Sequence, residues 1–300
     1  MRPLGGGGYV APINWTDQSW NDVLDESVRR LAELGLTPIQ GDVSTPDESP
    51  CLTFAMGWRV EELLPHQSEQ VVPLIYDAFP TNWKRIAGVI GASTIRTLLV
   101  TSRPSQRALQ MLLPDRKVCY CAEAVNLGVF GPSPSFLLRE RRVVEFGRRD
   151  PIWHAMARET LASSGIAHDY NAAVPGEATG PARRQEFIER LRTAAVSVCI
   201  PRAYTDPLQT GGLETMTCRY LESFAAGTLV LGSAPAQLTS LFGYNPVVEI
   251  DWINSSSQLT TVLDQLDDYR ELVERNTQRV AEVGDWEARA TELGTILDGV

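Results

Sequence analysis

The chain has 300 residues, of which 43% are hydrophobic and 21% charged, with a formal net charge of −10. This length suits two domains, and the negative charge argues against nucleic acid or an anionic membrane as the main partner. No run of 18 uncharged apolar residues occurs, so neither a transmembrane segment nor a signal peptide is expected. The odd number of cysteines, without metal-site spacing, predicts reduced thiols in a cytoplasmic protein.

The first half of the chain predicts strands that alternate with helices. A flexible leader is predicted at residues 1–18. The glycines at 5–8 are not expected to form a phosphate loop, because such a loop follows a strand and only four residues precede them. The first helix is predicted at 19–34, with no recognisable strand before it. Strands are predicted at 37–40, 52–56, 71–76, 97–101 and 117–121, and helices at 60–64, 82–91 and 105–113. Such alternation indicates a parallel sheet with crossover helices.

A second series of strands and helices follows a Gly- and Pro-rich linker at 128–135. Its strands are predicted at 143–146, 196–200, 229–231 and 247–250. Its helices are predicted at 153–164, 185–194, 214–226, 236–242 and 259–267, with a helical tail from 269. Two such series predict an α/β protein of two Rossmann-like domains facing across a cleft. Ligands of such sheets bind at the carboxyl ends of the strands.

Two carboxylates, Glu214 and Glu222, lie eight residues apart in a segment that predicts a helix. Eight residues are slightly more than two turns, so both would lie near one helix face, about 12 Å apart. That separation matches a bound nucleotide-sugar, with one carboxylate at the sugar hydroxyls and the other at the ribose diol. Gly211 and Gly212 precede them and favour a tight turn where backbone N–H groups attract an anion.

This stretch resembles the Glu-x7-Glu motif of retaining glycosyltransferases of the GT-B fold, the large family 4 or group 1. The resemblance includes residues 219–228, 73–80, 122–126 and 144–149, and extends over roughly residues 70 to 290. It implies an acceptor-side domain at 1–130 and a nucleotide-sugar-binding domain at 136–270. It also implies a helical tail at 271–300 that packs back on the first domain, with Trp286 and Arg289 in structural roles.

The resemblance also implies roles for the donor-site residues. Glu214 matches the glutamate that contacts the transferred sugar, and Glu222 the glutamate that holds the ribose. Gly147-Arg148 matches the family's pair whose arginine grips the diphosphate, which suits the planar fork of a guanidinium. The backbone N–H groups of Gly212 and Leu213 are expected to face phosphate or sugar.

A lysine that the family carries about five residues after this arginine is absent here, and Arg149 or His154 is the candidate to replace it. Thr217 is a candidate phosphate or ribose contact. Arg219 is expected either to contact the ligand or to pair with Glu222 three residues later.

Outside this pair of motifs, Arg202 follows a predicted strand and is expected to line the cleft. Asp77 ends the strand at 71–76 and is the candidate for acceptor binding or proton transfer. The basic clusters at 139–142 and 183–184 are expected to be solvated surface.

The expected activity is transfer of a sugar from a nucleotide-sugar to a small-molecule, glycan or other acceptor, with retention of configuration. No metal and no cofactor beyond the co-substrate are expected, since none of the three histidines has a metal-site spacing. Two alternatives stay open. One is a non-catalytic sugar-nucleotide-binding partner protein, and the other is a pseudo-glycosyltransferase or epimerase on the same fold.

Overall fold

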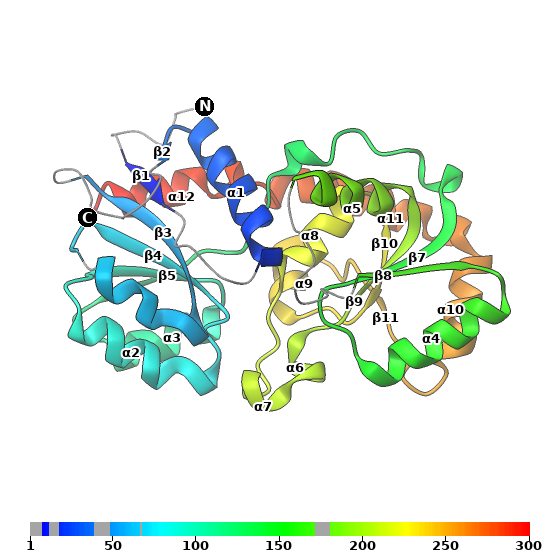
Figure 1. Ribbon diagram of the computed structural model, residues 1–300, viewed down its shortest axis with the longest axis horizontal. Coiled ribbons are helices and arrows are strands. Elements are labelled where there is room, and N and C mark those ends of the chain that lie inside the picture. Colours follow the sequence, from blue (N-terminus) through cyan, green and yellow to red (C-terminus); the bar gives the residue numbers. More distant parts are fainter. Residues whose placement is uncertain (1–7, 12–17, 39–48, 67, 172–180) are drawn as a thin grey trace. The chain divides into compact units, whose positions relative to one another are not determined.

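The computed structural model describes residues 8–11, 18–38, 49–66, 68–171 and 181–300. The chain divides into two compact units, each with its own parallel sheet (Figure 1). Unit 1 comprises Met1–Asn126, Leu208–Leu213 and Asp285–Val300, and unit 2 comprises Leu127–Pro207 and Glu214–Gly284. No helix in the described ranges is long and apolar enough to span a membrane. The expected leader lies largely outside the described residues.

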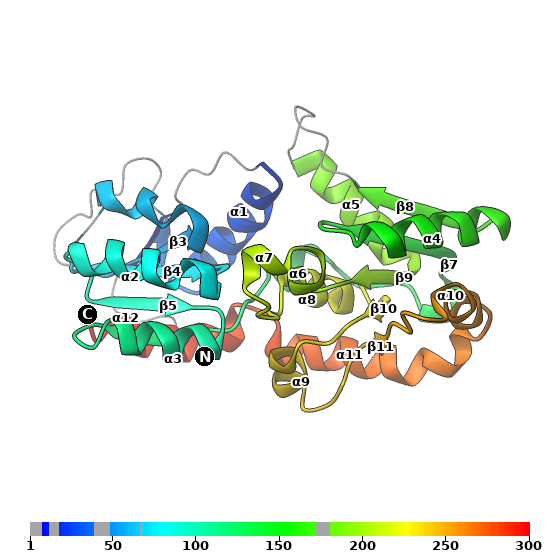
Figure 2. The same cartoon turned by 90° about the horizontal axis from the view of Figure 1, so that it is seen from below.

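Unit 1 is built on a six-stranded parallel sheet in the order β2-β1-β3-β4-β5-β6. Its strands are β1 (Tyr9–Ala11), β2 (Thr37–Pro38), β3 (Cys51–Met56), β4 (Val71–Tyr76), β5 (Thr97–Val100) and β6 (Lys117–Tyr120). Its helices are α1 (Gln18–Glu33), α2 (Trp83–Ala92), α3 (Arg103–Leu112), α7 (Pro207–Thr210) and α12 (Glu287–Leu297), shown from a second side in Figure 2. β3 and β4 are buried along their whole length, as expected of continuous apolar runs in a covered parallel sheet.

Strand β1 is a feature that the sequence did not predict. It pairs with both neighbours, Tyr9 lying opposite Thr37 of β2 and opposite Cys51 of β3. A strand of three residues is too short to show a period of two. The prediction that no strand precedes the first helix was therefore wrong.

The end of the chain belongs to unit 1. Trp286 is fully buried, and its ring meets Phe54 edge-on with the centroids 5.9 Å apart. The Arg289 guanidinium donates to the carbonyl oxygens of Ala122, at 3.1 Å, and Glu123, at 3.2 Å. The tail that packs on the first domain was predicted to start at residue 271. In the structure, α11 (Arg270–Val283) belongs to unit 2, and the chain returns to unit 1 only at Asp285.

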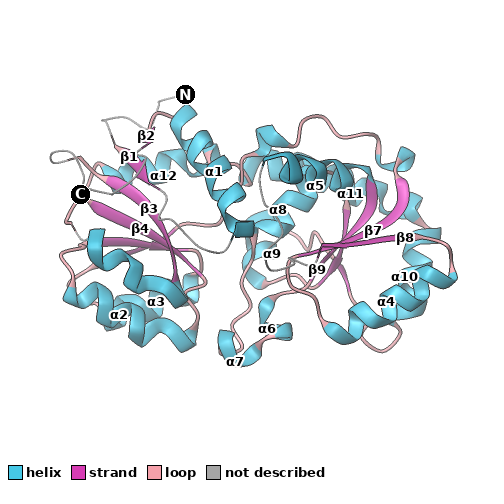
Figure 3. Cartoon of the chain, in the orientation of Figure 1, coloured by secondary structure: helices cyan, strands magenta, loops and turns pink. Residues whose placement is uncertain are grey.

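Unit 2 has a five-stranded parallel sheet in the order β11-β10-β9-β7-β8. Figure 3 labels β7, β8 and β9 of this sheet. Its strands are β7 (Glu140–Phe146), β8 (Ala167–Asn171), β9 (Ala194–Cys199), β10 (Leu229–Gly232) and β11 (Val248–Glu249). Its helices, besides α11, are α4 (Pro151–Ser163), α5 (Pro181–Thr193), α6 (Arg202–Thr205), α8 (Cys218–Ala225), α9 (Ala236–Phe242) and α10 (Ser255–Asp264). Strand β8 was not predicted, since its sequence Ala-His-Asp-Tyr-Asn is mostly polar; it lies at the sheet edge, where Asp169 pairs with Arg142 of β7.

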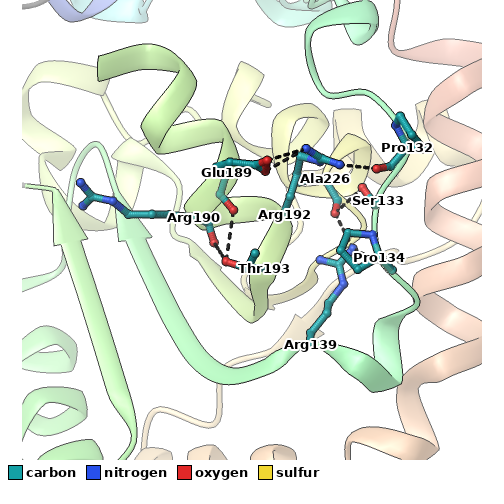
Figure 4. Close-up of polar contacts among 9 residues, drawn as sticks. All are labelled: Pro132, Ser133, Pro134, Arg139, Glu189, Arg190, Arg192, Thr193 and Ala226. Carbon is teal, nitrogen blue, oxygen red and sulfur yellow. Dashed lines mark hydrogen bonds and ion pairs between the residues drawn. The ribbon is translucent and has the colours of Figure 1, made fainter. Parts of the chain in front are cut away.

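The sequence placed Arg139 on the solvated surface, and this was wrong. Arg139 is buried and donates to the carbonyl oxygen of Ala226 at 2.6 Å (Figure 4). It also donates to the carbonyl oxygen of Ala194 at 3.2 Å. Gly227 has φ +68°, and a Cβ there would come within 2.7 Å of the same guanidinium. Burial lowers the pKa of Arg139 to about 10. This arginine joins the start of β7 to the ends of α5 and α8.

Candidate functional site

The carboxyl edge of the unit 2 sheet gathers several of the predicted donor-site residues. Because the strands are parallel, the segments after β7 and β9 leave the sheet at the same edge. β7 is followed by Gly147-Arg148-Arg149, and β9 is followed by Arg202 at the start of α6. This is the edge at which open α/β sheets bind their ligands.

The turn after β7 is held in place by Arg219 of α8. Its guanidinium donates to the carbonyl oxygens of Phe146 (3.1 Å), Arg148 (3.2 Å) and Ile200 (2.9 Å). Gly147 has φ +71°, and a Cβ there would lie 3.0 Å from Arg219 Cδ. Arg219 therefore fixes backbone at the ends of β7 and β9, a role that the two predicted alternatives did not include.

Arg148 is exposed on this turn, whereas Arg149 is half-buried and packs over the Tyr170 ring, 5.2 Å from its centroid. Arg149 Nη1 lies 3.4 Å from His154 Nε2. The two residues expected to replace the missing lysine are thus neighbours. Asp150 caps α4 and accepts the Ile152 and Trp153 N–H groups, so these donors are already satisfied.

Glu222 is buried in α8 and forms an ion pair with Arg184 of α5, at 2.6 Å. The side chain of Arg184 is only 10% exposed, so its expected position on the solvated surface was wrong. Its guanidinium carbon also lies 5.4 Å from the Phe187 ring centroid. Glu222 pairs with a residue that no sequence spacing connects to it, instead of with Arg219.

Glu214 does not lie on a helix, which corrects the sequence prediction. Helix α8 begins at Cys218, and Thr217 before it is extended (φ −126°, ψ 159°). Thr215 and Met216 are both buried, and residues 213–217 belong to neither a helix nor a strand. The separation of about 12 Å inferred for the two glutamates rested on helical geometry and no longer holds. Glu214 itself is exposed.

The two glycines before Glu214 lie in unit 1. Gly211 has φ +58°, and a Cβ there would come within 2.9 Å of Pro80 Cβ. The N–H groups of Gly212 and Leu213 bond to Thr210, through its hydroxyl at 3.3 Å and its carbonyl at 3.2 Å. These two N–H groups were expected to face a ligand, but in the structure each already has an acceptor within the chain.

Two further candidates lie near the carboxyl edge of unit 2. The buried Thr217 hydroxyl has no hydrogen-bond partner among the described residues, and such an orphan is the kind of group that a ligand satisfies. Arg202, the first residue of α6, forms an ion pair with Asp206, the residue that follows this helix, at 3.2 Å.

In unit 1, Asp77 follows β4 with φ +49°, the one non-glycine residue in the described ranges with positive φ. Its carbonyl oxygen packs tightly, since a Cβ at Gly57 would lie 2.5 Å from it. Aspartate is one of the few side chains that adopt this region readily, and the acceptor role of Asp77 stays a prediction.

A cluster that the sequence did not reveal lies beside Arg149. The carboxylate of Glu145 on β7 contacts Nδ1 of His154 on α4 and Nε2 of His168 on β8, the latter at 2.9 Å. Their ligand atoms all lie within 4.8 Å of one another. Spacings of 9 and 14 residues match no metal motif, and the unpredicted strand β8 carries His168 to the site.

No family model and no curated protein matches this sequence. Among solved structures, it is similar to HepE of Anabaena bound to UDP-glucose, with a TM-score of 0.61 and 10% identity over 98% of this chain and 100% of that chain. It is also similar to sucrose-phosphate synthase of Thermosynechococcus elongatus (TM-score 0.55, 15% identity, 83% and 73% coverage). A third is an α1,3-fucosyltransferase (TM-score 0.50, 12% identity, 99% and 92% coverage).

These neighbours are glycosyltransferases of GT-B type. The chain has the GT-B fold. The predicted fold class is therefore confirmed, while identities of 10–15% establish the fold alone. Membership of family 4 stays a prediction.

Proposed function

We propose that this GT-B protein is a hexosyl- or pentosyltransferase that moves a sugar from a nucleotide-sugar to an acceptor hydroxyl with retention of configuration. The observation that carries the proposal is the turn at Gly147, which Arg219 holds and on which Arg148 is exposed at the carboxyl edge of the unit 2 sheet. The structurally similar HepE was solved with UDP and glucose, so uridine nucleotides are the first donors to test.

In this reaction the bond between the anomeric carbon and the diphosphate oxygen breaks, and the acceptor oxygen forms a bond to the same face of that carbon. The acceptor proton passes to the departing phosphate oxygen, so no protein base is required. Arg148 acts on the negative charge that develops on the diphosphate, where a fixed cation lowers the barrier. Arg149 and His154, beside it, take the position of the family's lysine.

The remaining donor contacts are assigned to carboxylates and to one hydroxyl. Glu214, exposed before α8, binds the sugar hydroxyls, and Thr217 offers its unpartnered hydroxyl to ribose or phosphate. Glu222 binds the ribose diol, and the donor must compete with Arg184 for this carboxylate. Asp77 is assigned to the acceptor.

The test of the donor site is a thermal-shift panel of UDP, GDP, ADP, TDP and their sugar conjugates, with NAD as the negative control. A ligand that binds only the folded state raises the melting temperature. We expect at least one nucleoside diphosphate to do so and NAD to have no effect. If none of these ligands shifts the melting temperature at millimolar concentrations, the proposed donor site is contradicted.

We further propose that transfer requires no added magnesium or manganese. The sequence has no Asp-x-Asp pair of the kind that holds such an ion on a diphosphate, and arginine supplies the positive charge instead. The rate in a buffer free of both ions is expected to equal the rate with either one. A strict requirement for one of them would contradict the proposal.

One alternative has an observation in its favour. The ion pair between Glu222 and Arg184, together with the missing lysine, suits a partner protein that binds a sugar-nucleotide without turning it over. Donor hydrolysis without acceptor separates the two, since only an enzyme releases the nucleoside diphosphate. Analysis of the product then separates a transferase from an epimerase.

A further inference from the structure

We propose that Glu145, His154 and His168 form a binding site for one transition-metal ion of the zinc class. The proposal goes beyond sugar transfer and does not depend on it. The three side chains come from β7, α4 and β8 of the same unit. Two imidazoles and one carboxylate are a ligand set that zinc uses in proteins.

The geometry of the three groups is close to that of a chelating site. Nε2 of His168 lies 2.9 Å from Oε2 of Glu145, and Nδ1 of His154 contacts the same oxygen. Zinc bonds of about 2.0 to 2.2 Å place tetrahedral ligands roughly 3.3 Å apart. All three atoms already lie within 4.8 Å of one another, so only small side-chain rotations are needed.

Burial gives the cluster a reason to hold a cation. The side chain of Glu145 is 1% exposed and that of His168 is 7% exposed. Oε1 of Glu145 has no hydrogen-bond partner within the described part of the chain. A buried carboxylate with unused bonding capacity is costly unless a positive charge compensates for it. A bound ion supplies that charge.

The ligands sit on well-anchored backbone. β7 and β8 are paired along the whole of β8, and the first turn of α4 is capped by Asp150. Tyr170 packs edge-on against the His154 ring, with the centroids 4.8 Å apart, and restricts its orientation. Fixed ligands of this kind bind an ion without a large loss of side-chain entropy.

Nitrogen ligands decide which ions fit. Imidazole suits zinc, cobalt, nickel and copper, whereas magnesium and calcium prefer oxygen. With an ion on Nδ1, His154 carries its proton on Nε2, the atom 3.4 Å from Arg149 Nη1. Because the Arg149 guanidinium can only donate, it hydrogen-bonds to Nε2 only in the ion-free tautomer, so the ion would set the opposite tautomer of His154 and end this bond.

The experiment uses the whole chain, stripped with a chelator, desalted and titrated with zinc and, separately, with cobalt. We expect one ion per chain, a melting temperature raised by zinc, and cobalt absorption in the visible range typical of low coordination number. His154→Ala and His168→Ala should each weaken zinc binding by about 100-fold or more. His66→Ala is the matched control, since His66 is the only other histidine of the sequence, and it should bind as the unchanged chain does.

Glu145→Gln is a second test, because it removes the charge and keeps the size. It too should weaken zinc binding, while circular dichroism shows whether it folds. The proposal is overturned if the unchanged chain does not bind zinc. It is also overturned if His154→Ala and His168→Ala bind zinc as strongly as the unchanged chain does. Nucleotide binding is measured separately on each variant, so loss of the metal site is distinguished from failure of the donor site.

Discussion

Single side chains at the carboxyl edge of unit 2 differ in what they contact, and this separates ligand-binding candidates from structural ones. Arg219 is bonded to three backbone carbonyls, whereas Arg148, on the turn that Arg219 holds, is an exposed residue. The guanidinium group is therefore used to hold the backbone at Arg219, whereas Arg148 is exposed.

Arg148→Ala is expected to impair turnover without affecting folding. If its guanidinium meets the charge on the departing diphosphate, kcat/KM should fall about 30- to 1,000-fold, or roughly 2 to 4 kcal/mol. Arg158→Ala, an exposed arginine on α4, is the matched control and should leave the rate unchanged. Steady-state kinetics on both folded variants make the comparison. If Arg148→Ala turns over as fast as Arg158→Ala, Arg148 is an ordinary surface residue with no role in the reaction.

Glu222→Gln and Glu214→Gln are expected to differ in stability as well as in kinetics. Glu222 neutralises the largely buried Arg184, so its loss should lower the free energy of unfolding by about 3 kcal/mol and raise the donor KM. Glu214 is exposed; its loss should leave stability unchanged and lower kcat. Urea denaturation and donor kinetics on each variant provide the measurements. A stable Glu222→Gln variant with an unchanged donor KM would contradict both roles of Glu222.

Among the elements, the ends of helices and strands depend on contacts between residues far apart in the chain. The start of β7 and the carboxyl ends of α5 and α8 meet at Arg139, which bonds to Ala194 and Ala226. The carbonyl of Ala226, one residue past α8, lies at a helix end and accepts hydrogen bonds from both Arg139 and the Ser133 hydroxyl.

Arg139→Ala is therefore expected to lower the free energy of unfolding by about 2 to 4 kcal/mol, because it removes a buried donor from the carbonyls of Ala194 and Ala226 and leaves a cavity in its place. Arg141→Ala is the matched control. Arg141 lies two residues away, and its side chain is 53% exposed in a surface ion pair, so its loss should cost less than about 0.5 kcal/mol. Chemical denaturation of both variants tests the difference. Similar losses would mean that the contacts of Arg139 add nothing to stability.

At the scale of the whole molecule, both units bury ionisable groups in neutral form, and stability should therefore depend on alkaline pH. Burial raises the pKa of Cys51 and Cys121 in unit 1 to about 12, against an ordinary value of 9.0. In unit 2, burial raises the pKa of Cys199 to about 11. The folded state holds these protons at a pH where the unfolded chain releases them.

The free energy of unfolding should thus be constant up to about pH 8 and fall above pH 9. At pH 10 each of these thiols should cost about 1 kcal/mol. Arg139, whose pKa is lowered to about 10, has the opposite sign, but its effect begins only above that pH. Denaturation at pH 8 and pH 10 measures the slope, and Cys121→Ala should reduce it. A flat profile over this range would contradict the neutral burial of the thiols.

Much of the fold was predictable from sequence, because long strands buried on both faces show continuous apolar runs. β3, β4, β9 and β10 were predicted within one or two residues, as were helices such as α2 and α9. The short β1 and the polar edge strand β8 were not predicted, because three residues show no period and an edge strand needs little apolar surface. The helix expected from Glu214 starts instead at Cys218, because the backbone is still extended at Thr217.

The sequence by itself determined the two α/β series, the residues that follow each strand and hence the edge at which Arg148 lies. These follow from local apolar patterning and from the fixed direction of parallel strands. Only the tertiary structure decided which partner each charged group has: Arg184 for Glu222, backbone carbonyls for Arg219 and Arg139, and two histidines for Glu145. Such pairs join positions far apart in the chain, and burial, which sequence spacing does not encode, decides how strongly each one matters.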